Sequence, residues 1–349
     1  MRALTISAHG GLDRIEYRTD LPKPEPRVGE VRVRVRAAGL NHLDLFVVGG
    51  LPGVTITAPW ILGADATGVI DAIGDLSVSP NNGLQVGDTV IVNPGISDYT
   101  CEYCKAGEQS LCVSFKLLGE HLPGTIAEYL VVPARNVRVI PKDKPVEHAA
   151  AFTLSHLTAW RMIVTRARVQ KEEDVLIWGI GGGVALAALE LIRLMGATAW
   201  VTSHDDAKLS LARGLGAEHC LNYTQTDVGK EVRARTNKRG VNVVIDTVGE
   251  ATWQKSLTAL GKGGRLVTCG ATSGPMVQMD VRRLFWNQWD IMGSTMGNES
   301  EFDAITEQFR LGRLTPLVDS VFDIQAGRQA FERLASGQQF GKVVIRIPD

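Results

Sequence analysis

The stretch VLIWGIGGGVALAALELIRLMG, residues 175–196, decides the fold of this chain. It begins with a short apolar run bounded by glycine, which predicts a buried strand, and it ends with the apolar spacing of a helix over 185–196. The turn between them contains four glycines, Gly179, Gly181, Gly182 and Gly183. A strand that enters a helix through a glycine-rich turn is typical of a βαβ unit.

Strand and helix patterns alternate on the C-terminal side of this stretch. The segment 198–202 predicts a strand, 205–217 a helix, and 243–246 and 265–269 two further strands. Because parallel strands need long crossovers, alternation at this spacing predicts a parallel sheet connected by helices. This half of the chain is therefore expected to be a doubly wound α/β domain.

The first 150 residues have a different, β-rich pattern. Val31, Val33 and Val35 alternate with three arginines, which predicts a strand with one buried and one wet face. Further short apolar runs separated by Gly and Pro, with turns such as SPNNG (79–83), predict a small antiparallel barrel. A lone strand at 342–347 follows a helical segment and could rejoin this first domain.

The composition excludes several classes of protein. The 349 residues include 37 Lys and Arg against 38 Asp and Glu, whereas a nucleic-acid-binding protein usually has a basic excess. No apolar run reaches the roughly 18–20 residues that span a bilayer, and the N-terminus has no secretory signal core. We therefore expect a cytoplasmic protein that acts on a small molecule, without a nucleic-acid or membrane partner.

The glycine-rich turn is a candidate cofactor site. Glycine lets the backbone approach a pyrophosphate, and the N-terminus of the following helix offers N–H groups and a positive dipole. The candidate contacts are Gly179, Gly181, Gly182, Gly183 and Val184. Ala185 stands where a third small residue allows close packing of helix on strand. The alternative is an ordinary turn between strand and helix, without a ligand.

The end of the second strand bears on the choice between NAD and NADP. An acidic residue there would hold the ribose hydroxyl groups and repel a 2′-phosphate. This strand instead ends in Ser203 and His204, with Asp205 and Asp206 after them and Lys208 in the first helical turn. A hydroxyl, an imidazole and an ammonium suit a phosphate, so the sequence favours NADP(H), with NAD as the alternative. Ser203 or Asp205 could also cap the following helix.

Three of the five cysteines cluster with an aspartate. The four candidate ligands are Asp98, Cys101, Cys104 and Cys112. Three thiolates and one carboxylate can enclose a tetrahedral zinc ion without an open position, which predicts one structural zinc. The alternative is a loop of metal-free thiols, which would be prone to oxidation. Cys220 and Cys269 lie beside predicted strands and are expected to be buried, apolar residues.

These features together resemble the medium-chain dehydrogenase/reductase superfamily, which contains zinc alcohol dehydrogenases and quinone oxidoreductases. The resemblance covers essentially the whole chain, in the order of the family's motifs. The segments that carry it are AAGLNHLD (37–44), LGADATGVIDAIG (62–74), VGDTVIVNPG (86–95), the cysteine cluster, GTIAEYLVVP (124–133), LTAW (157–160), the glycine-rich turn and FGKVVI (340–345). The family implies a GroES-like β-barrel catalytic domain from residues 1–150 and 296–349, and a Rossmann cofactor domain from residues 151–295.

The departures from the family pattern concern the catalytic zinc. Zinc alcohol dehydrogenases have Cys where this chain has Asn41, His where it has Ala64, and a further Cys near its Leu154. These three side chains cannot form an open zinc site, so the comparison implies that no catalytic zinc is bound. The alternative is a rearranged metal site, formed by His42, Asp44, Asp65 and His156.

Asn41 at this position resembles the zinc-free quinone oxidoreductase branch, although many members of that branch have lost the cysteine cluster. That branch commonly binds NADPH through a Lys and a Tyr, which match Lys208 and Tyr223. The resemblance also implies that Asp65 hydrogen-bonds Asn41. Further cofactor contacts implied by the family motifs are Thr158, Val248, Gly270 and Lys342.

Without a catalytic metal, the expected chemistry is hydride transfer to an acceptor that is already electrophilic. The candidate catalytic residues are Asn41, His42 and Asp65. The Asn41 amide and the His42 ring could donate hydrogen bonds to a substrate oxygen. His42 could instead act as a base oriented by Asp44, contact the cofactor on its pyrophosphate side, or have a packing role only. We therefore expect an NADP(H)-dependent reductase of an activated alkene, quinone or aldehyde.

Two other functions stay open at this point. One is an NAD(P)-dependent alcohol dehydrogenase with a rearranged catalytic zinc, and the other is a cofactor-binding protein without turnover. The segment 282–295 ends the second domain and contains two tryptophans that are expected to be exposed. Because relatives pair along this edge, a homodimer or homotetramer is expected.

Overall fold

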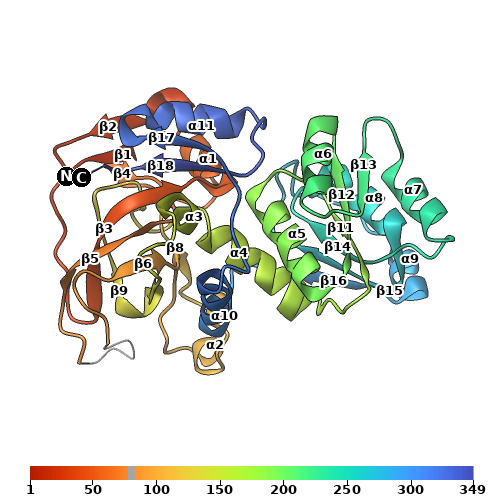
Figure 1. Ribbon diagram of the computed structural model, residues 1–349, viewed down its shortest axis with the longest axis horizontal. Coiled ribbons are helices and arrows are strands. Elements are labelled where there is room, and N and C mark those ends of the chain that lie inside the picture. The colour runs from red at the N-terminus through yellow and green to blue at the C-terminus, as the bar shows by residue number, and fades with distance from the viewer. Residues whose placement is uncertain (78–82, 349) are drawn as a thin grey trace. The chain divides into compact units, whose positions relative to one another are not determined.

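The computed structural model describes residues 1–77 and 83–348, so the turn expected at 79–83 lies almost entirely outside the described residues. The chain divides into two compact units, Met1–Leu154 with Asn298–Asp349, and Ser155–Gly297 (Figure 1). The domain boundaries expected from the sequence, 150/151 and 295/296, differ from these by a few residues. Within the described ranges, no helix combines the length and the hydropathy that a membrane span requires.

The first unit is built mainly from antiparallel strands. Its seven-stranded sheet has the order β10-β6-β5-β3-β18-β17, with β9 paired to β3 outside this path, and β2-β1-β4 and β7-β8 form smaller sheets. The strands are β1 (Ala3–Ile6), β2 (Glu16–Arg18), β3 (Glu30–Gly39), β4 (Trp60–Ile61), β5 (Thr67–Ile73), β6 (Thr89–Val92), β7 (Gly95–Ile96), β8 (Lys116–Leu117), β9 (Tyr129–Pro133), β10 (Val137–Val139), β17 (Val318–Asp323) and β18 (Lys342–Arg346). The predicted antiparallel, β-rich architecture is confirmed, and β17 with β18 is a parallel exception.

The central strand β3 differs from its prediction on one face. Val31, Val33 and Val35 are buried as expected, but Arg32 is only 7% exposed rather than wet. Its guanidinium contacts the carboxylates of Asp71 and Glu25, each at 2.6 Å. A buried charge is tolerated when it is paired in this way, and alternation along the strand alone could not reveal the pairing.

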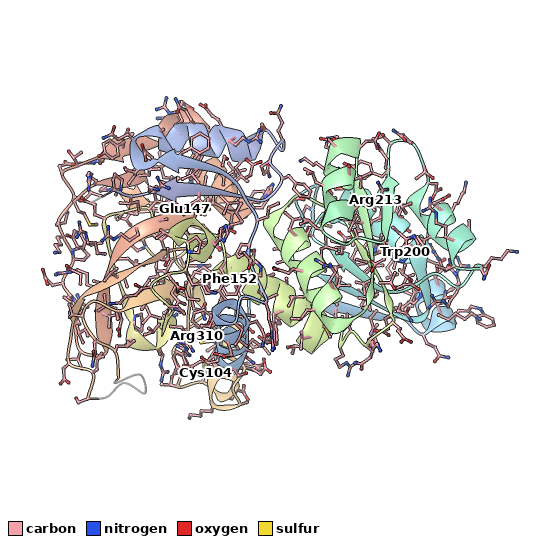
Figure 2. The ribbon with its side chains drawn as sticks, in the orientation of Figure 1. Cys104, Glu147, Phe152, Trp200, Arg213 and Arg310 are labelled. Carbon is pink, nitrogen blue, oxygen red and sulfur yellow. The ribbon has the colours of Figure 1, made fainter. Side chains whose placement is uncertain are left out.

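Short helices connect these strands. They are α1 (His42–Gly49), α2 (Glu102–Lys105), α3 (Val146–Ala150), α10 (Glu299–Arg310) and α11 (Gly327–Ala335), with single turns at Leu12–Arg14, Gln109–Leu111, Ala134–Asn136 and Ile324–Ala326. Helix α10 packs on the unit through Phe309, whose ring centroid lies 4.6 Å from that of Phe152; Phe152 is labelled in Figure 2. The next helix, α4 (Thr153–Trp160), crosses into the second unit.

Strand β18 brings the C-terminal end of the chain to the end of β3. The two strands are antiparallel, with Val344 opposite Gly39, and the N–H of Leu40 donates to the carbonyl of Val343 at 2.9 Å. The lone C-terminal strand therefore does rejoin the first unit. This register places Lys342, the first residue of β18, beside the segment that follows β3.

The second unit is a six-stranded sheet of order β13-β12-β11-β14-β15-β16, in which every neighbouring pair is parallel. The strands are β11 (Asp174–Ile177), β12 (Thr198–Ser203), β13 (His219–Asn222), β14 (Val241–Asp246), β15 (Leu260–Thr268) and β16 (Asp290–Gly293). The helices are α5 (Gly183–Met195), α6 (Asp206–Gly214), α7 (Val228–Arg235), α8 (Glu250–Ala259) and α9 (Val281–Asn287), preceded by a π-helical segment at Arg161–Arg166. The order reverses between the neighbours β11 and β14, which confirms the predicted doubly wound sheet.

Three burial predictions for this unit are wrong. Of the two tryptophans expected to be exposed, Trp286 is 73% exposed, but Trp289 is only 6% exposed and donates from Nε1 to the carbonyl of Gly261. Cys220 and Cys269 were expected to be buried, and each is only partly buried. By contrast, Trp200, which is labelled in Figure 2, lies in the core. Its Nε1 donates to Asp174 at 2.7 Å.

Candidate active site

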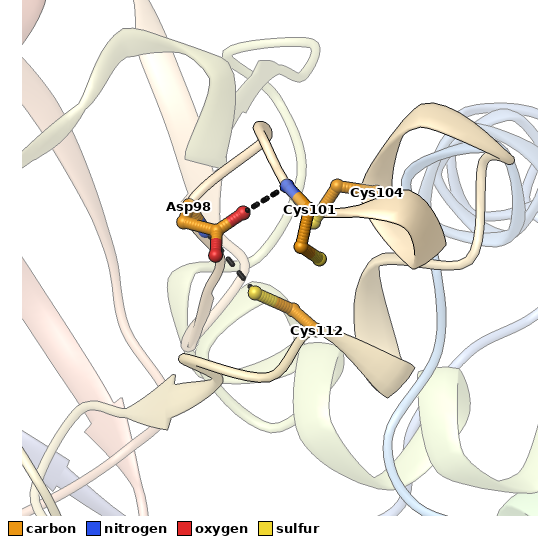
Figure 3. Close-up of side chains that lie close together, drawn as sticks. All are labelled: Asp98, Cys101, Cys104 and Cys112. Atoms are coloured by element: carbon orange, nitrogen blue, oxygen red, sulfur yellow. Dashed lines mark hydrogen bonds between the residues drawn. The ribbon is translucent and has the colours of Figure 1, made fainter.

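The predicted metal ligands lie together in the first unit, in the loop that follows β7. Ligand atoms of Asp98, Cys101, Cys104 and Cys112 all lie within 4.8 Å of one another (Figure 3). Donors at zinc-bonding distance in a tetrahedron lie about 3.3–3.8 Å apart, so a small contraction would close the shell around an ion. Among the residues that the structure describes, this is the only such group of potential ligands.

The protonation of Asp98 suits this role. The N–H groups of Cys101 and Thr100 donate to its Oδ1 at 3.0 and 2.8 Å, and they hold the pKa of this carboxyl well below its usual range. Backbone N–H groups of Asp98 and Ser114 point at the Cys112 sulfur at 3.3 and 3.4 Å. Such N–H groups stabilise negative charge on donor atoms, so the cluster fits a structural zinc ion.

The glycine-rich turn lies between β11 and α5 in the second unit. Gly179 and Gly181 have positive φ values of 68° and 121°, which residues with a Cβ rarely adopt. Gly182 is the N-cap of α5, and no side chain caps this end. The first N–H groups of α5, which begin at Gly183 and Val184, are therefore presented to a ligand at the positive end of the helix dipole. These residues fit the pyrophosphate of a dinucleotide.

At the end of β12, both acidic residues are used within the protein. Asp205 caps α6 by accepting the N–H groups of Ala207 and Lys208 at 2.8 and 3.4 Å, as the capping alternative predicted. Asp206 accepts hydrogen bonds from Asn222 and Gln225 at 2.8 and 3.1 Å. Both carboxylates thus stabilise the local structure around α6, which agrees with a structural role for the two acids.

The residues matched to a 2′-phosphate lie around the same strand end. Ser203 is buried and its Oγ accepts the N–H of Asp205 at 3.1 Å. Nδ1 of His204 lies 3.0 Å from the hydroxyl of Tyr223, so these two side chains are brought together. Lys208 is also buried, on the first turn of α6.

The other expected cofactor residues of the second unit lie on several elements. Val248 follows β14 and faces the glycine-rich turn, because a Cβ built on Gly179 would lie 3.8 Å from it. The carbonyl of Gly270, which follows β15, accepts a hydrogen bond from Thr268 at 3.2 Å. Thr158 lies on α4, where its hydroxyl donates to the sulfur of Met296 at 3.7 Å.

A buried polar cluster in the first unit contains the remaining predicted site residues. Asn41 ends the segment after β3, Asp65 follows β4, and Lys342 begins β18. Lys342 Nζ lies 2.6 Å from Asn41 Oδ1 and 3.0 Å from Asp65 Oδ2, and Asn41 Nδ2 donates to the same Asp65 oxygen at 3.0 Å. The predicted hydrogen bond between Asn41 and Asp65 is thus present, and Lys342 completes a triangle with them.

The comparison with known proteins places both units in one family. Residues 27–142 match the family model "Alcohol dehydrogenase GroES-like domain", and residues 183–310 match "Zinc-binding dehydrogenase". A crystal structure of an NAD-dependent alcohol dehydrogenase is 39% identical, covers 100% of both chains and superposes with a TM-score of 0.93. The chain belongs to the medium-chain dehydrogenase/reductase superfamily.

Curated members of the superfamily resemble this dehydrogenase/reductase along its whole length. An NAD-dependent alcohol dehydrogenase from Sulfolobus acidocaldarius is 29% identical over 99% of this chain and 100% of its own. A quinone oxidoreductase from Homo sapiens is 24% identical over 99% of this chain and 98% of its own. The chain is therefore an enzyme, an NAD(P)H-dependent oxidoreductase with a GroES-like and a Rossmann domain.

In this dehydrogenase/reductase, two of the three residues that the sequence comparison matched to catalytic zinc ligands, Asn41 and Leu154, hydrogen-bond to Asp65. The N–H of Leu154 donates to Asp65 Oδ1 at 2.7 Å, while Asn41 and Lys342 contact Oδ2. Thr125 donates from its hydroxyl to the Asp65 carbonyl at 2.8 Å. Both carboxylate oxygens are thus engaged, and the cation beside them is the Lys342 ammonium.

The rearranged metal site considered for His42, Asp44, Asp65 and His156 is not supported by this arrangement. Asp44 Oδ2 accepts the backbone N–H of Asn41 at 2.7 Å. His156 Nε2 lies 3.1 Å from a carboxylate oxygen of Glu190. Within the described residues, no hydrogen bond joins His42 to Asp44, so the orientation of a His42 base by Asp44 is also not supported.

Burial, more than the nearby charges, shifts the pKa values of the two titratable groups of α1. Burial raises the pKa of Asp44 to about 7, although the Asn41 N–H and the Lys342 ammonium act against this shift. Desolvation, helped by the Lys342 charge, lowers the pKa of His42 below its ordinary value. The ring of His42 is therefore largely neutral near pH 7.

The sequence alone did not reveal what Lys342 contacts. Its motif predicts a cofactor contact, whereas in the structure Nζ binds Asn41 and Asp65. The contacts of Lys342 follow from the pairing of β18 with β3, because this pairing places Lys342 next to the segment that follows β3. Register between strands so far apart in sequence could not be read from local patterns.

Proposed function

We propose that this dehydrogenase/reductase reduces an activated alkene, quinone or aldehyde with NADPH, and does so without a catalytic zinc. The observation that carries the proposal is the contact of Lys342 Nζ with Asn41 Oδ1 and Asp65 Oδ2. An ammonium at this place repels a divalent cation and occupies the oxygens that would bind it. The human quinone oxidoreductase among the relatives supports the same class of acceptor.

The nicotinamide cofactor would supply the hydride. The turn at Gly179, Gly181 and Gly182 and the N-terminus of α5 would hold its pyrophosphate. An electrophilic acceptor needs only a hydrogen-bond donor near the oxygen that gains negative charge, whereas an unactivated alcohol would need a metal or a base to take its proton. The Lys342 ammonium, as a hydrogen-bond donor in a cluster whose carboxylate and amide oxygens are already engaged, therefore favours reduction of a conjugated or otherwise activated carbonyl compound.

The preference for NADPH over NADH is part of the same proposal. The two acids at the end of β12 are engaged by the protein, whereas Ser203, His204, Lys208 and Tyr223 lie around this strand end. We expect the affinity for NADPH to exceed that for NADH by about tenfold, which corresponds to one additional charge-assisted contact. Fluorescence titration with the two reduced cofactors measures this ratio.

A second candidate function is an NAD-dependent alcohol dehydrogenase, the activity named for the Sulfolobus acidocaldarius relative. That reaction would need a zinc ion in the polar cluster of Asn41, Asp65 and Lys342. This ion would be a second one, in addition to the structural zinc expected in the cysteine cluster. Metal analysis of the purified enzyme separates the two functions. One zinc per chain supports the reductase that lacks a catalytic zinc, and two zinc ions per chain support the alcohol dehydrogenase.

The activity test is oxidation of NADPH with a panel of enones, quinones and aldehydes. We expect turnover with at least one of these classes and no stimulation by added zinc. Activity that disappears on chelation and returns with zinc would contradict the proposal. Turnover with simple alcohols and NAD alone would favour the second candidate.

We also propose that two copies of the enzyme associate along β16, alone or within a homotetramer. β16 is an edge strand, and the adjacent segment exposes several large apolar side chains, namely Met276, Val277, Val281, Phe285 and Trp286. An exposed apolar patch beside an unpaired strand edge favours association. The cytoplasmic location expected from the sequence stays a prediction.

A further inference from the structure

We infer that Lys342 is a catalytic residue, which binds the substrate oxygen and stabilises the negative charge that develops on it. The inference rests on the proposed zinc-free reduction and names the group that would do the work of the missing metal. It differs from the cofactor contact that the sequence motif implied for this lysine.

The first argument is the supply of hydrogen-bond donors. Asn41 has two N–H bonds on Nδ2, and these go to the carbonyl of Gly39 at 3.3 Å and to Asp65 at 3.0 Å. The Asn41 amide therefore has no donor left for a substrate, contrary to the expectation from the sequence. An ammonium has three N–H bonds, and Lys342 uses two of them, on Asn41 and Asp65.

The second argument is exposure. The side chain of Asp65 is fully buried, whereas that of Lys342 keeps 5% of its surface exposed. Within the cluster, Lys342 therefore keeps a small solvent-accessible surface, whereas the Asp65 carboxylate has none. Asn41 and Asp65 hold the ammonium in place, so they act as positioning residues.

The third argument is charge. His42, on the neighbouring helix α1, is the alternative donor, but desolvation, helped by the Lys342 charge, lowers the pKa of its ring below the ordinary value. A neutral ring can donate a hydrogen bond but cannot neutralise an oxyanion. In a site with little water, a fixed cation stabilises developing charge more than a neutral donor does.

The reaction step balances without a metal. The substrate accepts a hydride at its β carbon, and the electron pair of the C=C bond moves so that the carbonyl oxygen becomes an enolate oxygen. The third N–H of Lys342 donates to that oxygen, and a proton from water then adds to the α carbon. The reduced nicotinamide cofactor is the hydride donor and the only reductant required.

The test compares Lys342→Gln with wild type and with Lys262→Gln, which removes an exposed lysine elsewhere. We expect K342Q to lower kcat by about 10²–10³-fold, the usual loss for an oxyanion donor, with the dissociation constant of NADPH changed less than about threefold. K262Q should match wild type. A K342Q variant with unchanged kcat and weakened NADPH binding would overturn the inference, because Lys342 would then contact the cofactor.

A second readout needs no turnover. p-Nitrophenol mixed with the NADP⁺-bound enzyme serves as an enolate mimic, and its phenolate absorbance reports ionisation. We expect it to ionise at lower pH when bound to wild type than in water, and K342Q to abolish this shift. Wild-type enzyme that binds the phenol without favouring its ionised form, or that does not bind it, would overturn the inference.

Removal of Lys342 leaves the Asp65 carboxylate buried without its cation, which can unfold the protein. The double variant Asp65→Asn with Lys342→Gln removes both charges, and it should also lose the phenolate shift. Even if neither variant folds, the ionisation of p-nitrophenol bound to the wild-type enzyme tests whether the site stabilises an oxyanion. Failure of the substrate panel with a normal phenolate shift would overturn the proposed substrates while supporting the role of Lys342.

Discussion

At the residue scale, the proposed site consists of three side chains, Asn41, Asp65 and Lys342, that hydrogen-bond to one another. Asp65 accepts from Asn41, Lys342 and the N–H of Leu154, and it does so with no exposed surface. Buried charges are stable only when they are paired and hydrogen-bonded, and this cluster meets both conditions. The resemblance to the family predicted Asn41 in place of a zinc ligand and its hydrogen bond to Asp65, but it did not predict that the Lys342 ammonium contacts both side chains.

Asp44 gives a prediction about pH and stability. Burial raises its pKa to about 7 in the folded enzyme, above the value of an exposed aspartate. Its contribution to stability is therefore complete below about pH 4 and is lost as the pH rises toward about 7. Asp44→Asn keeps an oxygen that can accept the Asn41 N–H but does not ionise, so its unfolding free energy should lack this fall.

Urea denaturation of wild type and D44N between pH 4 and 8 measures the difference. The exposed Asp13→Asn is the matched control and should follow wild type. Parallel curves for wild type and D44N over this range would show that Asp44 ionises as freely in the folded enzyme as in the unfolded chain.

At the element scale, the glycine-rich turn and its helix were predicted well because their pattern is local. The strand predicted at 175–179 and the helix predicted at 185–196 correspond to β11 and α5. Each of their four ends differs from the prediction by one or two residues. Contacts between distant elements were predicted less well. The burial of Trp289 and of Arg32 depends on partners, Gly261 and Asp71, that no local pattern identifies.

The turn before α5 gives the second prediction. Gly181 has a φ of 121°, so Gly181→Ala would strain the backbone and place a methyl group in the turn that we propose to hold the pyrophosphate. We expect the affinity for NADPH to fall at least about tenfold, while the fold is kept. Gly214→Ala, at the exposed end of α6, is the control and should bind NADPH like wild type. Equal affinities for wild type and G181A would remove this turn from the cofactor site.

At the scale of the whole molecule, the two units and their α/β class could be predicted from the order of motifs. The sequence did not predict that β18, near the C-terminus, pairs with β3 of the N-terminal segment in the first unit. That pairing is what creates the polar cluster, because it places Lys342 beside Asn41. The main features of the cofactor site are thus local in sequence, while the proposed catalytic site is formed by long-range contacts.

Assembly gives the third prediction. Trp286 is 73% exposed within the apolar patch beside β16, and a charge there would oppose burial of the patch. We expect Trp286→Glu to be monomeric by light scattering at micromolar concentration, and wild type to be a dimer or tetramer under the same conditions. Leu311→Glu alters an exposed apolar residue of the first unit and should leave assembly unchanged. A W286E variant of wild-type size would place the interface elsewhere.

The most direct test of the central claim is the zinc content and activity of the Cys104→Ser variant. The account predicts that this variant contains no zinc, has a looser loop over residues 95–115, and still reduces the substrate with NADPH at nearly the wild-type rate. Cys220→Ser, outside the cluster, should keep one zinc per chain. A Cys104→Ser enzyme that retains one zinc, and whose activity is lost when that zinc is removed, would contradict the account.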